Sequence, residues 1–205
     1  MIELGQHEGD YLDICRNFRQ VYDTPCIQEV EICLIKLMVI DDLFQDVDEK
    51  MNALKNIVLY IVLAKYNNEQ SDLIHRIKTE RALDDIDSYK RILEKFITDE
   101  IISQADFCRE FEVELRQTDA FSQSEAGDKR WGDLKARIVE HNIRMMAKYY
   151  TKIRLTRMAH LLALSENETE DCLSDMVVAG TVSAKTDRLA GIVDFTEQEV
   201  NMMMI

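Results

Sequence analysis

Apolar residues recur at helical spacing through the last third of the chain. In residues 128–153 they are Trp131, Leu134, Ile138, Ile143, Met146, Tyr149 and Tyr150. Lysine and arginine lie between them, a pattern typical of one amphipathic helix of about six or seven turns. A shorter apolar stripe follows over residues 155–162. The two patterns predict a long helix followed by a short packing helix.

The next helix is delimited by its own terminal signals. Ser165 and Glu168 have the Ser-x-x-Glu spacing of a capping box, in which each side chain accepts from a backbone N–H at the other position. A helix is therefore expected to begin at Glu166. Gly180 marks its end, because glycine adopts the left-handed conformation common after a helix without penalty.

Two short β-branched segments come after this helix. Residues 181–184 and 192–195 predict strands, and the segment between them contains the turn formers Asp187 and Gly191. The strands and their turn form the hairpin called a wing. Helix, turn, helix and hairpin in this order predict a winged helix.

The first 125 residues have the pattern of a helical scaffold. Only one proline and six glycines interrupt the 205 residues of the chain, so few residues oppose helices. Amphipathic patterns occur at residues 10–22, 51–66, 71–77, 86–97 and 104–115. Stacked helix pairs are the expected arrangement. Residues 119–127, rich in Ser, Asp and Gly, are expected to form a linker to the long helix.

Charge decides whether the winged helix would bind nucleic acid. The helix over residues 166–179 has no lysine or arginine, and the whole chain has 39 acidic against 25 basic residues, a net charge of -14. The acidic residues of this helix are Glu166, Glu168, Glu170, Asp171 and Asp175. Phosphates repel such a helix, because neutralising phosphate charge supplies most non-specific affinity. The sequence therefore predicts no nucleic-acid partner.

Six sequence blocks carry a family resemblance. The winged-helix part contains EHNIRMMAKYYTKI, RMAHLL and AKTDRLAGIVDF. The upstream part contains YLDICRNFRQVYDTPCIQ, LYIVLAKYNNEQSDLIHRI and KRWGDLKARIVEHNIR. These blocks resemble the PCI domain, which is shared by subunits of the proteasome lid, the COP9 signalosome and the initiation factor three complex. The resemblance covers most of residues 9–196 and is closest to the lid subunits.

The residues and the resemblance together predict a mainly α fold. We expect a helical-repeat (TPR-like) bundle followed by a winged-helix subdomain with a small β-hairpin or three-stranded sheet. The helical-repeat region is expected at residues 1–125, with the helical part of the PCI domain beginning near residue 50. The linker helix and winged-helix subdomain are expected at residues 126–196, followed by a short tail at residues 197–205.

The resemblance implies a non-catalytic scaffold subunit of the proteasome regulatory lid, acting in ubiquitin-dependent protein degradation. In that family the winged helices of neighbouring subunits join edge to edge, which agrees with the unpaired edge that a small sheet leaves open. The implied partners are other PCI subunits of the lid. The expected contact residues are Val182, Ala184, Lys185, Arg188 and Ile192.

Three alternatives remain open. The first is a PCI subunit of the signalosome or of initiation factor three, although the YDTPCIQ and NEQSDLIHRI blocks favour the proteasome. The second is a nucleic-acid-binding winged helix, which the acidic helix disfavours. The third is a diverged paralogue that does not enter the lid.

The chain departs from the family pattern in three places. Residues 30–47 have no counterpart in the family and are expected to be an insertion. After Phe195 only TEQEVNMMMI follows, whereas lid subunits continue into a C-terminal helix. The long N-terminal helical arm of lid subunits has no match either. These departures predict a truncated or diverged relative, or a fragment.

Catalytic and metal-ligating patterns are missing from the sequence. His7, His75, His141 and His160 form neither His-x-His nor His-Glu-x-x-His, and there is no glycine-rich phosphate loop. Cys172 lies in the acidic helix, where carboxylates should raise its pKa and weaken it as a nucleophile. We therefore expect no enzyme, no cofactor, no metal and no small-molecule substrate.

Membrane and secretion signals are missing as well. The most apolar run, ICLIKLMVI at residues 32–40, contains Lys36 and is far shorter than the stretch of about 20 residues that spans a bilayer. No basic and apolar leader begins the chain. The five cysteines have no paired spacing and favour free thiols. We expect no membrane partner and a location in the cytoplasm and nucleus.

Two further features have both a structural and a functional interpretation. Met145, Met146 and Met158 are expected to fill the core, the alternative being a methionine-rich partner groove. Basic residues are dense along the long helix and just after it, which favours a solvated face or, as the alternative, a surface for an acidic partner. These residues are Lys135, Arg137, Arg144, Lys148, Lys152, Arg154 and Arg157.

Overall fold

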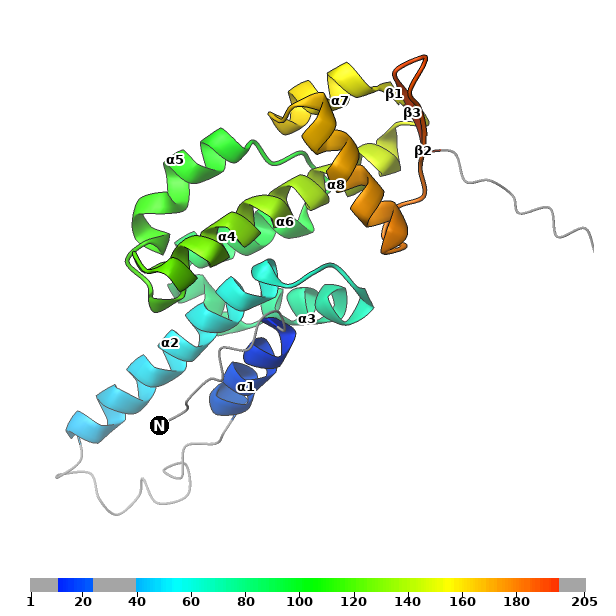
Figure 1. The fold of residues 1–205 in the computed structure, drawn as a ribbon. Coiled ribbons are helices and arrows are strands. Elements are labelled where there is room, and N and C mark those ends of the chain that lie inside the picture. Colours follow the sequence, from blue (N-terminus) through cyan, green and yellow to red (C-terminus); the bar gives the residue numbers. More distant parts are fainter. Residues whose placement is uncertain (1–10, 24–39, 196–205) are drawn as a thin grey trace, which may run out of the picture. The chain divides into compact units, whose positions relative to one another are not determined.

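The computed structural model describes residues 11–23 and 40–195 (Figure 1). The chain divides into two compact units, Met1–Ile97 and Thr98–Ile205. The expected insertion at residues 30–47 lies outside the described residues as far as residue 39, and its remainder belongs to a helix. The expected tail at residues 197–205 also lies outside them.

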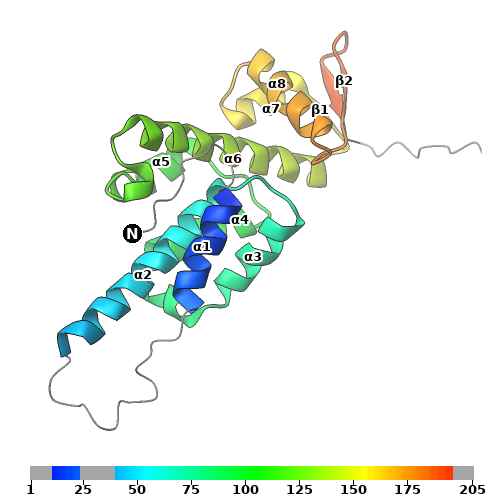
Figure 2. The same cartoon turned by 60° about the horizontal axis from the view of Figure 1, so that its bottom comes forward.

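The regular secondary structure of the first unit is entirely helical within its described residues. Its elements are α1 (Tyr11–Asp23), α2 (Ile40–Leu63), α3 (Asn68–Lys78), the 3-10 helix η2 (Arg81–Asp85) and α4 (Asp87–Ile97). Helix α2 contacts α1, α3 and α4, and Figure 2 shows α1 running alongside it. From Ile57 to Leu63 every side chain of α2 is buried, so this helix forms the centre of the unit.

The end of α2 is set by the helix that follows it. The side-chain oxygen Oδ1 of Asn67 accepts a hydrogen bond from the Gln70 N–H at 2.7 Å and caps α3. The buried Gln70 side chain donates from Nε2 to the Ile61 carbonyl oxygen at 3.1 Å. Helix α2 therefore stops at Leu63 rather than at residue 66. At its other end it begins at Ile40, before the predicted start at residue 51.

The second unit combines helices with a small sheet. Its helices are α5 (Gln104–Leu115), η3 (Asp119–Phe121), α6 (Glu125–Tyr149), α7 (Leu155–Leu162) and α8 (Glu166–Val178). Helices α5 and α7 have the predicted bounds. Helix α6 is the predicted long helix, but it ends before residue 153 because Tyr150 is extended, with φ -112° and ψ 132°.

The predicted linker at residues 119–127 is wrong, because these residues are packed. Phe121 is fully buried and meets Trp131 of α6 edge to face, with ring centroids 5.6 Å apart. Gly127 lies within α6, and a Cβ there would come within 1.9 Å of the Ser122 carbonyl oxygen. The segment forms the tightly packed entry to α6, inside the second unit. The expected division between residues 125 and 126 thus lies inside the second unit, which begins at Thr98.

Three short strands form one antiparallel sheet in the second unit. They are β1 (Lys152–Arg154), β2 (Lys185–Asp187) and β3 (Ile192–Asp194), in the spatial order β1-β3-β2. Helices α7 and α8 lie beside the sheet in Figure 1. The mainly α fold that ends in a winged helix with a three-stranded sheet is confirmed.

The first wing strand begins later than predicted. Residues 181–184 are not a strand, because the N–H groups of Thr181 and Val182 both donate to the Met176 carbonyl oxygen, at 2.9 and 3.4 Å, and close the end of α8. This places Val182 in the core, and the chain becomes free to pair with β3 only from Lys185 onward. Strand β3 agrees with the prediction for residues 192–195 to within one residue.

The terminal signals of α8 are confirmed. Ser165 Oγ accepts from the Glu168 N–H at 3.3 Å, and Glu168 Oε2 accepts from the Ser165 N–H at 2.9 Å. The Ser165 hydroxyl also donates to Glu168 Oε2 at 2.6 Å, and this hydrogen bond, with that from the Ser165 N–H, favours the ionised carboxylate and lowers the pKa of Glu168. Gly180 follows the helix with φ +70°, the left-handed conformation expected of it.

One apolar core holds the winged helix together. It joins the end of α6 to α7, α8 and the inner face of the sheet. Met146 and Met158 are fully buried in it, so the structural interpretation of these two methionines is confirmed. Its buried members are Val139, Ile143, Met146, Ile153, Leu155, Met158, Leu162, Leu173, Met176, Val182, Val193 and Phe195.

Candidate partner-binding surface

The three-stranded sheet has one buried face and one outer face. Ile153 and Val193 point into the core, so the residues on either side of them point outward. The register places the outward residues in two rows, Arg154–Ile192–Asp187 and Lys152–Asp194–Lys185. The outer face is therefore a small surface of mixed charge with one apolar side chain, Ile192, on its central strand.

The five predicted contact residues are divided between this surface and the core. Lys185 and Ile192 lie on the outer face, and Arg188 lies in the turn after β2. Ala184 is partly buried and packs against the core. Val182 is only 8% exposed and belongs to the core itself, which corrects its assignment to an exposed surface.

Both outer strands have backbone groups that point away from the sheet. Phe195 N–H donates to the Thr151 carbonyl oxygen and Leu155 N–H to that of Gly191, each at 2.8 Å. In an antiparallel pair the hydrogen-bonded positions alternate, so Ile153 is bonded to β3 while the amides of Lys152 and Arg154 point outward. By the same alternation, the backbone N–H and carbonyl of Thr186 in β2 point away from β3. The sheet thus has two edges able to accept a further strand.

The turn that joins β2 to β3 is held in one conformation. Asp187 Oδ1 accepts from the N–H groups of Leu189 and Ala190, both at 3.0 Å, and Gly191 has φ +63°. Arg188 Nε lies 2.5 Å from Glu170 Oε1 and ties the turn to α8. Arg188 therefore has a structural role in addition to its expected place at a contact.

Helix α8 occupies the position of the second helix in a helix-turn-helix, yet its chemistry is acidic. It has five carboxylates and no basic residue, and Val177 and Val178 at its end are exposed. Burial raises the pKa of Cys172, and the nearby Asp175, Glu140, Asp171 and Glu168 raise it further. The expected direction of this pKa shift is confirmed, with burial as the larger cause.

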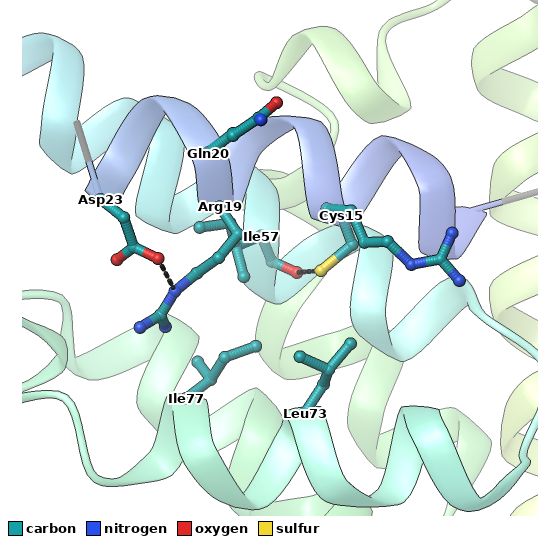
Figure 3. A pocket seen from close by; sticks show the side chains of 8 residues that line it. Cys15, Arg19, Gln20, Asp23, Ile57, Leu73 and Ile77 are labelled. Carbon is teal, nitrogen blue, oxygen red and sulfur yellow. Dashed lines mark hydrogen bonds and ion pairs between the residues drawn. The ribbon is translucent and has the colours of Figure 1, made fainter.

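The first unit contains a cavity, which is a second candidate binding place. It has a volume of about 370 Å³ and is lined mainly by α1, with Ile57, Leu73 and Ile77 opposite (Figure 3). The thiol of Cys15 lies 3.8 Å from the Ile57 carbonyl oxygen, and burial raises its pKa to about 12. The thiol is therefore held protonated and is a poor nucleophile.

The remaining candidate chemistry is structural where the structure describes it. His141 is buried in α6, its Nε2 lies 2.9 Å from the Glu100 carbonyl oxygen, and burial lowers its pKa. Within residues 11–23 and 40–195, three or more His, Cys, Asp or Glu side chains do not gather at any point that could hold a metal ion. No helix among the described residues is long and apolar enough to cross a membrane.

Helices followed by a winged helix with a three-stranded sheet define the class of protein. The PCI domain family model matches residues 86–197, and the chain belongs to the PCI-domain family. The chain is similar to the 26S proteasome regulatory subunit rpn501 of Schizosaccharomyces pombe, with 33% identity over 199 residues, 97% of this chain and 41% of that protein. It is also similar to the 26S proteasome non-ATPase regulatory subunit 12 of Dictyostelium discoideum, with 36% identity over 196 residues, 96% of this chain and 40% of that protein.

The chain also has a weaker similarity to a protein named as a subunit of another complex. The COP9 signalosome complex subunit 4 of Drosophila melanogaster is 26% identical over 155 residues, 76% of this chain and 37% of that protein. The resemblance to PCI subunits of the proteasome is confirmed by the family match and by the proteasome relatives. The chain spans about two fifths of the length of those relatives.

Strand β1 is the part of this surface that the sequence analysis missed. The sequence predicts one helix over residues 128–153 and assigns Lys152 and Arg154 only to a basic segment. The only local signal in the sequence is the alternation of basic Lys152, apolar Ile153 and basic Arg154, which is too short to indicate a strand by itself.

Proposed function

We propose that this chain is a non-catalytic scaffold subunit of the regulatory lid of the 26S proteasome, where it supports ubiquitin-dependent protein degradation through contacts with other PCI subunits. The observation that carries the proposal is the similarity, over 97% of the chain, to a protein named as a 26S proteasome regulatory subunit. The sheet geometry supports the same function, because two unpaired edges accept strands from neighbouring molecules.

The proposed contact surface is the outer face of the sheet with its two edges. Lys185 and Ile192 lie on it, and Arg188 holds the adjacent turn. Ala184 and Val182 support it from the core side. A specific contact of this kind buries a total of about 1,200 to 2,000 Å².

A scaffold role without catalysis agrees with the chemistry of the described residues. The raised pKa values of Cys15 and Cys172 disfavour a thiolate nucleophile. The acidic α8 disfavours nucleic acid as a partner. The proposal includes no cofactor, no membrane partner and no small-molecule substrate, and it places the protein in the cytoplasm and nucleus with the proteasome.

The test is affinity purification of the tagged, full chain from the cells that produce it, followed by mass-spectrometric identification of the associated proteins. PCI subunits of the proteasome lid are the expected associated proteins, in amounts comparable to the bait. Recovery of the chain without any PCI subunit would contradict the proposal and favour a diverged paralogue outside these complexes.

A second candidate is a subunit of the COP9 signalosome. The observation that favours it is the similarity to subunit 4 of that complex over 76% of the chain. The proteasome relatives match with higher identity and over more of the chain, which is why we prefer the lid. The same purification distinguishes the two, since signalosome subunits in place of lid subunits would select the second candidate.

A further inference from the structure

We propose that residues 98–103, the entry segment of the second unit, form a latch on α6 that opens locally in mild acid, when His141 takes up a proton. The segment connects the two compact units, because the first ends at Ile97 and α5 begins at Gln104. The inference concerns a conformational device of the fold and goes beyond the proposed function. It rests on the contacts that hold the segment, on its low burial and on the surroundings of His141.

Two adjacent residues of α6 bind the backbone of the entry segment. Asn142 forms hydrogen bonds with both backbone polar groups of Ile102, at 2.8 and 2.9 Å. Nε2 of His141 lies 2.9 Å from the Glu100 carbonyl oxygen, and this nitrogen carries the hydrogen because a carbonyl oxygen only accepts. The segment is therefore held by a neutral amide and by a titratable ring side by side.

A third contact lies further along α6 and is ionic. Lys148, about two turns beyond His141 on the same face of the helix, forms an ion pair with Asp99. The two side chains are 52% and 49% exposed, so water and salt screen the pair. The three contacts align the segment antiparallel to α6. Among the three α6 side chains that make them, only the histidine changes its charge near neutral pH.

Little of the entry segment is buried. Ile102 is its one buried residue, and the other five residues are exposed. A region opens locally at low cost when it has few buried apolar contacts and many backbone groups near solvent. The apolar core of the winged helix, around Met146 and Met158, does not include any residue of the segment. The segment is therefore able to leave α6 while this core stays formed.

Acid acts on the segment through His141. The residue is 1% exposed, and burial lowers the pKa of its imidazole. The charge of Arg144 on α6 lowers this pKa as well, whereas the hydrogen bond to Glu100 and the charge of Asp99 raise it. The closed segment thus favours the neutral ring. An open segment exposes the ring, which then binds a proton with an ordinary pKa of 6.5, so falling pH favours the open segment.

Opening lengthens the free chain between the two units. In the closed form Asp99 is already held on α6, and Thr98 alone separates it from the end of α4 at Ile97. In the open form the whole of residues 98–103 forms the connection. A longer flexible connection gives its two ends a wider range of separations. Protonation of one buried ring is thereby converted into a change in the connection between the units.

A buried histidine with a hydrogen bond has a competing explanation, because it is often a purely structural residue. Acid would then destabilise the second unit as a whole, and the entry segment would open only together with the core. The two explanations predict different hydrogen exchange. A local latch exchanges its amide hydrogens more readily than the core helices do, whereas a structural histidine leaves the segment as protected as those helices.

The experiment measures hydrogen–deuterium exchange of the full purified chain by mass spectrometry at about pH 7 and about pH 5.5. Protection of residues 98–103 is compared with that of residues 173–178 in α8, each corrected for the intrinsic effect of pH on exchange. The test variant is His141→Gln, which keeps a donor for the Glu100 carbonyl. The matched control is His160→Gln at an exposed position of α7. Lys148→Ala weakens the ionic contact and leaves the titratable ring in place.

We expect the wild-type segment to be less protected than α8 at both pH values. Its protection should fall by up to about eightfold between them, the limit set by a pKa of 6.5 in the open segment. His160→Gln should behave as the wild type, whereas His141→Gln should lose this pH response. Lys148→Ala should lower the protection of the segment at both pH values and keep the response.

Two results would overturn the inference. One is an equal pH response in the wild type and in His141→Gln, and the other is equal protection of the segment and α8. Should His141→Gln fail to fold, NMR titration of the four histidine rings of the wild type decides instead. A His141 ring that titrates near 6.5 while the segment stays protected contradicts the latch. A ring that titrates only at lower pH, together with loss of protection, supports it.

Discussion

The carboxamide of Asn142 forms hydrogen bonds with both backbone polar groups of Ile102. Its Oδ1 accepts from the Ile102 N–H at 2.8 Å, and its Nδ2 donates to the Ile102 carbonyl oxygen at 2.9 Å, although the two residues are 40 positions apart. Both residues are buried. The pair fixes the segment before α5 onto α6 within the second unit.

Replacement of Asn142 by alanine should destabilise the protein by about 2 to 4 kcal/mol, because it leaves a buried N–H and a buried carbonyl without partners. Urea unfolding followed by circular dichroism measures the change. The matched control is Asn167→Ala at an exposed position of α8, expected to change stability by less than about 0.5 kcal/mol. A similar loss for both variants would argue against the specific role of the clamp.

The neighbouring His141 should make stability depend on pH. Burial lowers its pKa from 6.5, and the charge of Arg144 lowers it further, opposed by the hydrogen bond to Glu100 and the charge of Asp99. Below pH 6.5 the unfolded chain binds a proton that the folded chain resists, so this stability is present above 6.5 and is lost as pH falls toward the lower folded-state pKa.

The variant His141→Gln tests this dependence, since glutamine can still donate to the Glu100 carbonyl but does not titrate. The free energy of unfolding of the wild type should fall more steeply than that of the variant between about pH 7 and pH 5. Measurements of denaturant unfolding across this range check the prediction. Parallel curves for the two proteins would show that His141 does not carry the effect.

Val182→Asp should unfold the winged helix rather than test a contact. Val182 lies in the core beneath the end of α8, so an aspartate there would bury a carboxylate and cost about 3 kcal/mol or more. Val178→Asp, on an 88% exposed side chain of α8, is the control and should change stability by less than about 1 kcal/mol. Thermal unfolding distinguishes the two, and equal melting temperatures would contradict the placement of Val182.

Ile192→Asn should weaken association with the lid while preserving the fold. Ile192 is the apolar side chain on the outer face of the central strand, and its replacement should change stability by only about 1 kcal/mol because it is partly solvated already. Quantitative co-purification of lid subunits measures the effect. Val113→Asp on α5, 75% exposed, serves as the control and should co-purify normally. Full recovery with Ile192→Asn would remove the outer face from the proposed interface.

The chain should not bind duplex DNA measurably at physiological salt. Helix α8 has five carboxylates and no basic residue, and the net charge of the chain is -14. Fluorescence anisotropy with a labelled duplex tests this. Salt-sensitive binding at about micromolar protein would contradict the electrostatic argument.

Elements with local signals could be read from the sequence alone. Helices α5 and α7 have the predicted bounds, and the capping box at Ser165 with Gly180 delimits α8, because caps and helical faces depend on residues three or four positions apart. The acidity of α8 and the free state of Cys172 in it follow from composition alone. The sequence also predicts that Lys185 and Ile192 lie in a wing, because turn formers separate residues 181–184 from residues 192–195.

The sheet and the surface on it were decided by contacts between distant residues. Residues 181–184 have the β-branched composition of a strand, yet the amides of Thr181 and Val182 are taken by the Met176 carbonyl oxygen. Residues 152–154 follow a long helical pattern, yet they pair with β3 about 40 residues later. Helix signals are local, but a three-residue strand is defined only by its partner, so its edges and the residues on its outer face exist only once the tertiary fold has formed.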